Sequence, residues 1–416
     1  MRITRILKLN PKSTRNQGLR AAHGWRQALP LLAAYGSAAL LAACGGGGTP
    51  APAAPALSPA AALGEKIFKD ASLSASGRMS CATCHAPAAA HAQTNDLAVQ
   101  LGGPGLDVAG FRAVPSLRYL GSTPAFFFAK DGTATGGFNR DGSADSLLAQ
   151  AARPFLAAHE MANGDAKTVV DKLARASYAA DFRKAFGDNV LVDPDAAFLA
   201  MRHALQRYQL ENTAEFAPFT SKYDAFLAGQ LKLSDPELRG LALFNNSAKG
   251  NCAACHPSAR GSDGSAPLFT DFSFDNLGVP RNTDIPATAD AGYFDLGLCQ
   301  ASRPELAARS DLCGAFKVPT LRNVATRRAF FHNGRFKTLR EALRFYVTRD
   351  TNPELWYPVV NGLADKFNDL PPAYRANVNT SEVPYNRKPG DAPALSDAEI
   401  EDLLAFLATL SDGYAP

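Results

Sequence analysis

Two short segments of this chain carry the same five-residue pattern, in which a histidine directly follows the second of two cysteines. The first segment is Cys81-Ala-Thr-Cys84-His85 and the second is Cys252-Ala-Ala-Cys255-His256. At the start of a helix, positions i, i+3 and i+4 share a face, so each segment presents two thiols and an imidazole to one ligand. Such side chains serve three chemistries: a dithiol redox pair, a zinc site and the covalent attachment of haem.

The histidine in both copies separates these three chemistries. A dithiol of the thioredoxin type needs strand–helix–strand surroundings, which neither segment has. One zinc ion could be held by all four cysteines, but that leaves both histidines unexplained. In haem c, two cysteines form thioether bonds with the vinyl groups and the histidine binds the iron. The patterns therefore predict two covalently bound haem c groups, held by Cys81, Cys84 and His85 and by Cys252, Cys255 and His256.

The second axial ligand of each iron distinguishes an electron carrier, with both faces closed, from an enzyme with an open face. Beyond Cys44, methionine occurs only in the first half of the chain, so the second haem cannot take one from its own half. Its candidates are His332 and several tyrosines. First-half candidates, each favoured as structural over iron-binding, are His91, His159, Met161, Met201 and His203.

Residues 1–43 have the features of a secretory signal peptide. Seven basic and no acidic residues precede Cys44, and an apolar stretch from about residue 29 ends in Leu-Ala-Ala-Cys44. Small residues before a cysteine resemble a bacterial lipobox, which implies lipidation of Cys44; an ordinary signal peptide is the alternative. Residues 44–61 are expected to be a flexible tether. We therefore expect a periplasm-facing lipoprotein, on the outer membrane, that contacts the membrane only through its lipid anchor.

The chain beyond Cys44 is close to neutral. Of 43 basic residues, 36 remain there against 39 acidic ones, a net charge of −3. This balance gives no reason to expect nucleic-acid binding. Cys299 and Cys313 are left over from the haem patterns; in an exported protein they are expected to form a disulfide that pins a loop, with two free thiols as the alternative.

The chain reads as an internal repeat, because an amphipathic helical pattern precedes each haem segment. Before the second, Ser234 is a helix cap, and Ser396 caps another helix near the C-terminus. Helical patterns recur at 165–187 and 195–210, whereas strand alternation is scarce. We predict an all-α fold of two cytochrome c-like haem domains with long loops, 62–230 and 231–416.

Three further segments resemble the bacterial di-haem cytochrome c peroxidase family, and within it the MauG-like branch. Residues 139–161 resemble the family's stretch from Trp-Asp-Gly-Arg to a proline and Glu-Met. Residues 316–334 resemble its Val-Pro-Thr-Leu-Arg-Asn-Val and His-Asp-Gly signature, and 339–358 follow. The resemblance covers roughly 62–412. It implies two haems near a domain interface, with the N-terminal haem reacting with peroxide.

The resemblance assigns the peroxide chemistry to three residues. Glu160 matches the family's acid over the peroxidatic haem, Pro154 matches the proline before it, and Gln150 matches a glutamine on the same side. A carboxylate there can take a proton from peroxide and return it to the departing oxygen. His159, beside Glu160, is expected to be a bystander.

At the second haem the resemblance implies a tyrosine ligand. Tyr346 falls where MauG-like members place that tyrosine, and His332 where the family places a histidine near the haem but off the iron. An anionic phenolate stabilises ferric and higher iron states and lowers the potential.

The chain departs from the family in three places. Residues 97–117 lack the displaceable histidine of many family peroxidases, and His91 is not expected to replace it, so the first haem should be five-coordinate and need no reductive activation. Arg140 replaces a tryptophan between the haems. Ala113 replaces an asparagine that helps to hold an interdomain calcium. The remaining calcium donors would be the carbonyls of Arg327 and Ala329, and calcium is left open because it prefers six to eight oxygen ligands.

The sequence thus predicts a di-haem c peroxidase that reduces H2O2 at the N-terminal haem with electrons from an external donor. The donor is a small cytochrome or a cupredoxin, or, in MauG-like chemistry, a side chain of a partner protein, which Tyr346 favours. The alternative is a non-enzymatic di-haem electron carrier with both irons six-coordinate. The missing second-half methionines and the segment around Glu160 count against it.

Overall fold

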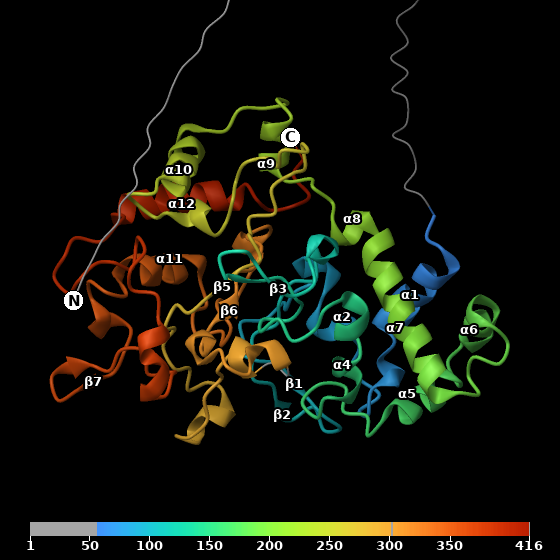
Figure 1. Ribbon diagram of the computed structural model, residues 1–416. Coiled ribbons are helices and arrows are strands. Elements are labelled where there is room, and N and C mark those ends of the chain that lie inside the picture. The colour runs from blue at the N-terminus through green and yellow to red at the C-terminus, as the bar shows by residue number, and fades with distance from the viewer. Residues whose placement is uncertain (1–55, 301–302, 416) are drawn as a thin grey trace, which may run out of the picture. The chain divides into compact units, whose positions relative to one another are not determined.

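Helices carry most of the regular structure in the computed structural model, which describes residues 56–300 and 303–415 (Figure 1). The helices are α1 (Pro59–Lys69), α2 (Cys81–Cys84), α3 (Leu147–Gln150), α4 (Arg153–Leu156), α5 (Ala166–Leu173), α6 (Ala179–Phe186), α7 (Pro194–Glu211), α8 (Thr213–Phe216), α9 (Lys222–Leu227), α10 (Asp235–Asn245), α11 (Leu339–Thr348) and α12 (Asp397–Ala408). No helix in this part of the chain is long and apolar enough to cross a membrane.

Sheet structure in the described residues is limited to antiparallel pairs of two-residue strands. The pairs are β1 (Leu101–Gly102) with β2 (Val108–Ala109), β3 (Phe127–Phe128) with β4 (Ala134–Thr135), β5 (Phe274–Asp275) with β6 (Phe316–Lys317), and β7 (Val359–Val360) with β8 (Leu363–Ala364). The predicted helical class is therefore confirmed, with these small two-stranded sheets added.

The tether predicted for residues 44–61 extends too far along the chain, because its last three residues are helical. Helix α1 begins at Pro59, and Ser58 caps it by accepting a hydrogen bond from the Ala61 N–H. The N–H and hydroxyl of Ser58 also donate to the Glu211 carboxylate at the end of α7, at 2.8 and 2.9 Å. Ser-Pro is a strong helix start, which the composition-based boundary overlooked. Cys44 and residues 1–43 lie outside the described residues, so the lipid anchor stays a prediction.

The predicted helix caps are confirmed. Ser234 and Ser396 each form a capping box, with Glu237 and Glu399 respectively. The pattern at 165–187 divides into α5 and α6, because the chain turns at 174–178. The pattern at 195–210 is α7.

Two pairs of long helices frame the two halves of the described chain. Figure 1 shows α1 beside α7 and α10 beside α12, and both pairs are in close contact. Each pair crosses at a glycine: a Cβ on Gly64 would collide with the carbonyl oxygen of Ala204, and one on Gly240 with that of Asp402. The axes can approach this closely only because glycine has no side chain.

Buried apolar side chains form two main clusters. One is drawn from residues 63–216 and the other from residues 223–410. The division between them falls near the predicted boundary at 230. The described residues nevertheless belong to one compact unit, so two repeated domains remain a prediction.

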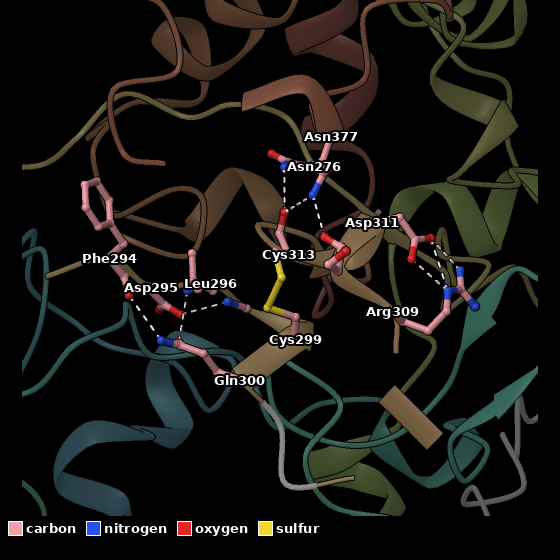
Figure 2. The surroundings of a disulfide bond; sticks show 12 residues. Asn276, Phe294, Asp295, Leu296, Cys299, Gln300, Arg309, Asp311, Cys313 and Asn377 are labelled. Atoms are coloured by element: carbon pink, nitrogen blue, oxygen red, sulfur yellow. Dashed lines mark hydrogen bonds and ion pairs between the residues drawn. A yellow bond between two sulfur atoms is a disulfide. The ribbon is translucent and has the colours of Figure 1, made fainter. Parts of the chain in front are cut away.

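A disulfide closes a loop in the second half. It joins Cys299 to Cys313, with their Cα atoms 4.8 Å apart (Figure 2). The side-chain amides of Asn276 and Asn377 both donate to the Cys313 carbonyl, at 3.2 Å. Asp295, just before the loop, accepts the Gly297 N–H at 3.0 Å. The disulfide therefore fixes the chain next to Asp295, whose carboxylate faces the other half.

Replacing Gly64 by alanine should destabilise the protein by about 1–3 kcal/mol, because the added methyl group must push α1 away from α7. The measurement is denaturant unfolding of the holoprotein. Gly164→Ala is the matched control, since a Cβ there meets nothing within 4 Å and its effect should stay within about 0.5 kcal/mol. Equal effects of the two changes would show that the helix crossing does not depend on glycine.

Candidate active site

One cavity of about 950 Å³ is lined by both Cys-x-x-Cys-His segments. This volume lies at the upper end of the roughly 300–1,000 Å³ found for cofactor sites. None of the four thiols in these segments is in a disulfide. The cavity lining from the two segments includes every cysteine and histidine of the two patterns: Cys81, Cys84, His85, Cys252, Cys255 and His256.

The two segments differ slightly in local structure. Helix α2 spans the first, and its start is capped by Ser80, whose N–H donates to the Thr83 hydroxyl at 3.0 Å. The second is a tighter 3₁₀ turn, Cys252–Ala254. Both retain the helical hydrogen bond from the histidine N–H to the first cysteine carbonyl, at 2.8 and 2.9 Å. This bond gathers both thiols and the imidazole at the cavity wall, as the spacing predicts.

Each imidazole is oriented by its Nδ1 atom. Nδ1 of His85 lies 3.2 Å from the carbonyl oxygen of His91, and Nδ1 of His256 lies 2.7 Å from that of Phe269. A ring that donates through Nδ1–H keeps the lone pair of Nε2 for a metal. Burial lowers the pKa of His85 to about 4 and also lowers the pKa of His256. Both rings are therefore neutral near pH 7, as iron ligation requires.

The backbone that supplies these carbonyls is unusual in the same way at both sites. His91 and Phe269 both have φ of 54°, in the left-handed region that bulky residues rarely adopt. Just before them, the Ala90 carbonyl accepts from the Ser116 hydroxyl and the Leu268 carbonyl from the Thr320 hydroxyl, each at 2.6 Å. The hydroxyls belong to matching segments, Val-Pro-Ser-Leu-Arg at 114–118 and Val-Pro-Thr-Leu-Arg at 318–322. This five-residue match is a sequence signal of the repeat that the helical patterns did not reveal.

The residues present fit haem c better than the other two chemistries. Burial raises the pKa of Cys81 and Cys252 to about 12, whereas a redox dithiol needs a thiol that ionises easily. Within the described residues, no group of three His, Cys, Asp or Glu side chains is placed to hold a metal ion. Covalent haem attachment requires two unpaired thiols and an imidazole Nε2 lone pair that face a large cavity. Both segments provide these groups.

Glu160 lines the same cavity as the first segment, together with Gln150 and Pro154. It lies in the turn after α4, where its N–H donates to Ala157 O at 2.9 Å. Its carbonyl accepts the Gly103 N–H at 2.9 Å, which ties the turn to the β1–β2 hairpin. The three residues that the family resemblance selects are thus brought together.

Partial burial raises the pKa of Glu160, and the charge of Arg153 opposes this shift. Nε2 of His159 lies 3.6 Å from a Glu160 carboxylate oxygen. The His159 ring packs edge-on against Phe111, which stacks on Tyr293, with ring centroids 4.8 and 5.9 Å apart. The expectation that His159 is a bystander overlooked this contact with Glu160.

Of the first-half candidates for an iron ligand, His159 and Met161 line the cavity. His91 is fully buried behind His85, stacked on Phe216 at 4.1 Å, with Nε2 3.3 Å from the Glu215 carboxylate. His91 therefore cannot reach the open face of the first site in this fold. Met201 and His203 lie on α7, away from the cavity wall.

Tyr346 lies on α11 in the cavity wall near the second segment. Burial, followed by the Asp275 carboxylate, raises its pKa above the usual 10. Only a strong positive charge such as an iron ion would favour its phenolate. Its ring is 5.5 Å from Phe331 and 6.1 Å from Tyr385.

His332 also lines the cavity, but its ring is held by neighbouring side chains. It stacks face to face on Phe316, with centroids 3.7 Å apart and planes 7° from parallel. Its Nε2 lies 3.6 Å from the Asp369 carboxylate. These contacts suit a residue in the surroundings of a haem.

A guanidinium bonds to the backbone of Ala113, the residue that replaces the family's calcium-binding asparagine. Nε of Arg140 donates to Ala113 O at 2.8 Å, and Arg327 donates to the adjacent Val114 O at 2.6 Å. Arg327 and Ala329 line the cavity nearby. Calcium ligation by their carbonyls stays a prediction.

The comparisons with known proteins agree with this site. A family model for di-haem cytochrome c peroxidases matches residues 58–232. The methylamine utilization protein MauG of Paracoccus denitrificans is 35% identical over 381 residues, covering 88% of this chain and 92% of that protein. Cytochrome c551 peroxidase of Nitrosomonas europaea is 29% identical over 321 residues, covering 75% and 80%. The crystal structure of the diheme peroxidase BthA from Burkholderia thailandensis matches with a TM-score of 0.79 at 41% identity, covering 86% and 87%.

Replacing Cys81 and Cys84 together by alanine should lower the covalently bound haem from two groups per chain to one, because one pair of thioether bonds cannot form. The measurement is a pyridine haemochrome assay on denatured, washed protein. The double change of Cys252 and Cys255 should give the same result. Cys299→Ser with Cys313→Ser is the control and should retain both haems. Two haems remaining after C81A/C84A would contradict the assignment.

Proposed function

The chain belongs to the MauG-like di-haem cytochrome c peroxidases, a family of oxidoreductases, and from this premise we propose that it reduces H2O2 at the site built around Cys81, Cys84 and His85. The observation that carries the proposal is the position of Glu160. Its carboxylate lines the same cavity as His85 and lies close enough to raise the pKa of Cys84.

Glu160 moves the protons of the reaction. Bound haem supplies the redox-active iron that delivers electrons to peroxide. The Glu160 carboxylate accepts a proton from one peroxide oxygen and returns it to the other, which leaves as water. Two electrons and two further protons complete the reduction of H2O2 to two waters. Burial that raises the pKa of Glu160 suits this work, because the group must hold the proton between the two transfers.

Gln150 and Pro154 shape the space in which Glu160 works. Both line the cavity, and the Pro154 carbonyl accepts the Met161 N–H at 3.0 Å, which fixes the turn that carries Glu160. His159 limits the movement of the carboxylate from its other side. The buried position of His91 supports an open first site that is ready without reductive activation.

Electrons come from an external donor, which we propose to be a small redox protein or a side chain of a partner protein. Relatives named for each kind of chemistry, MauG and cytochrome c551 peroxidase, match this chain. Tyr346 in the wall of the second site favours the MauG-like chemistry, since a phenolate ligand lets the second haem share oxidising equivalents. Cys44 and the preceding signal would place the enzyme on the periplasmic side of the cell envelope.

Glu160→Gln should slow the reaction of the holoprotein with H2O2 by about two to four decades, because the amide cannot accept the proton. The measurement is stopped-flow absorption, with Glu354→Gln, a change at an exposed carboxylate, as the control. In the unaltered protein the rate should fall as the pH drops through the Glu160 pKa, which lies above the usual 4.5. The variant should lack this step. A variant rate within twofold of the parent would support the electron carrier instead.

Tyr346→Phe should change the absorption and EPR spectra of the ferric second haem, because phenylalanine has no oxygen to bind the iron. Tyr385→Phe is the matched control, since it removes a hydroxyl from the neighbouring ring and should leave the iron ligands unchanged. Unaltered spectra in the Tyr346 variant would exclude this tyrosine as the ligand.

A further inference from the structure

Cationic side chains outnumber carboxylates where the two halves of the described chain meet. Residues 112–114 and 137–141 from the first half contact residues 295, 317 and 327 from the second. We call this region the seam. Its cations are Arg112, Arg140, Lys317 and Arg327, its carboxylates are Asp141 and Asp295, and all six side chains belong to residues that line the cavity.

Arg112 engages both carboxylates of the seam. Its Nε and one terminal nitrogen donate to Asp295 at 2.6 and 2.7 Å, and the other terminal nitrogen donates to Asp141 at 2.6 Å. With four cations and two carboxylates, the seam has an excess of two positive charges. The arrangement around Arg112 also leaves no seam carboxylate bonded to the other three cations.

The other three cations bond only to neutral backbone carbonyls among the described residues. Arg140 donates to Ala113 O at 2.8 Å, Arg327 to Val114 O at 2.6 Å, and Lys317 to Gly137 O. Burial lowers their pKa values to about 9, 10 and 8, in the same order. Burying a charge without a counter-charge is unfavourable, so the arrangement needs an anionic partner.

The three cations are also close to one another. Arg140 and Arg327 bond to the carbonyls of consecutive residues, and the backbone N–H of Lys317 donates to Arg140 O at 2.8 Å. An arginine has five N–H donors, and within the described part of the chain Arg140 uses one of them in a hydrogen bond. Its terminal donors can therefore form paired bonds with a carboxylate.

We propose that Arg140, Arg327 and Lys317 bind the propionate carboxylates of the two haems, and that their charge raises the reduction potentials of both. The proposal rests on the proposed function, because it requires haem in the cavity. Covalent attachment of the vinyl edge to the cysteines leaves the propionate edge of each haem pointing away from them. A fixed positive charge near the iron disfavours the ferric state, which carries one more positive charge than the ferrous state.

The test is spectroelectrochemical titration of the holoprotein carrying Arg140→Gln. Loss of the charge should lower both midpoint potentials, with the reduction equilibrium constant falling about tenfold, which is about 59 mV for one electron. Arg140→Lys keeps the charge and should retain most of the potential. Arg260→Gln is the matched control, because this exposed arginine also bonds to a backbone carbonyl, that of Gly264, and does not line the cavity.

Lys317→Gln is a second variant that tests the proposal if Arg140→Gln fails to fold. It should also lower both midpoint potentials. The propionate bending bands in the resonance Raman spectrum provide a readout independent of activity, and they should shift in both variants. Unchanged potentials and unchanged bands in the variants that fold would overturn the proposal. The reaction of the unaltered protein with H2O2 separates this outcome from failure of the proposed function, since a di-haem electron carrier would lack that reaction and would still show the shifts in potential and in the propionate bands.

Discussion

Two hydrogen bonds, from imidazole Nδ1 atoms to backbone carbonyls, determine where the other parts of each site must lie. Each bond requires a carbonyl turned toward the ring, and the chain provides it by holding His91 and Phe269 in the left-handed region. That conformation is unfavourable for a residue with a large side chain, so neighbouring contacts must maintain it. The hydroxyls of Ser116 and Thr320 do so by bonding to the preceding carbonyls. This shared arrangement supports the predicted internal repeat.

The two histidines are held in the same way, but the cavity wall beside each of them carries a different functional side chain. At the first site, partial burial raises the pKa of the Glu160 carboxylate, so the group can exchange a proton. At the second site, burial keeps the Tyr346 phenol neutral until a cation binds it. A proton-transfer group and a potential iron ligand therefore occupy corresponding halves of one fold. Under the proposed function, this difference assigns separate tasks to the two haems, one toward peroxide and one toward the electron donor.

Features determined by neighbouring residues could be predicted from the sequence. The Cys-x-x-Cys-His segments and the caps at Ser234 and Ser396 depend on a few adjacent side chains. Glu160 could be found only through the family resemblance, because nothing in its local pattern separates it from a surface acid. Contacts between distant segments could not be foreseen, as with Arg112 and Asp295, which are 183 residues apart. The ring contact between Phe111 and Tyr293 escaped prediction for the same reason.

The disulfide loop of the second half helps to position charged side chains of the seam. Cys299 and Cys313 fix the chain beside Asp295 (Figure 2). Asp295 holds Arg112 in a two-point ion pair. Arg112 also bonds to Asp141, so both carboxylates of the seam hydrogen-bond to Arg112 and neither hydrogen-bonds to Arg140 among the described residues. The positive charges of Arg140, Arg327 and Lys317 therefore remain available to an anion in the cavity that these residues line. We therefore propose that Arg140, which stands where the family resemblance places a tryptophan, acts through a fixed charge, and that the disulfide loop helps to hold the seam around it.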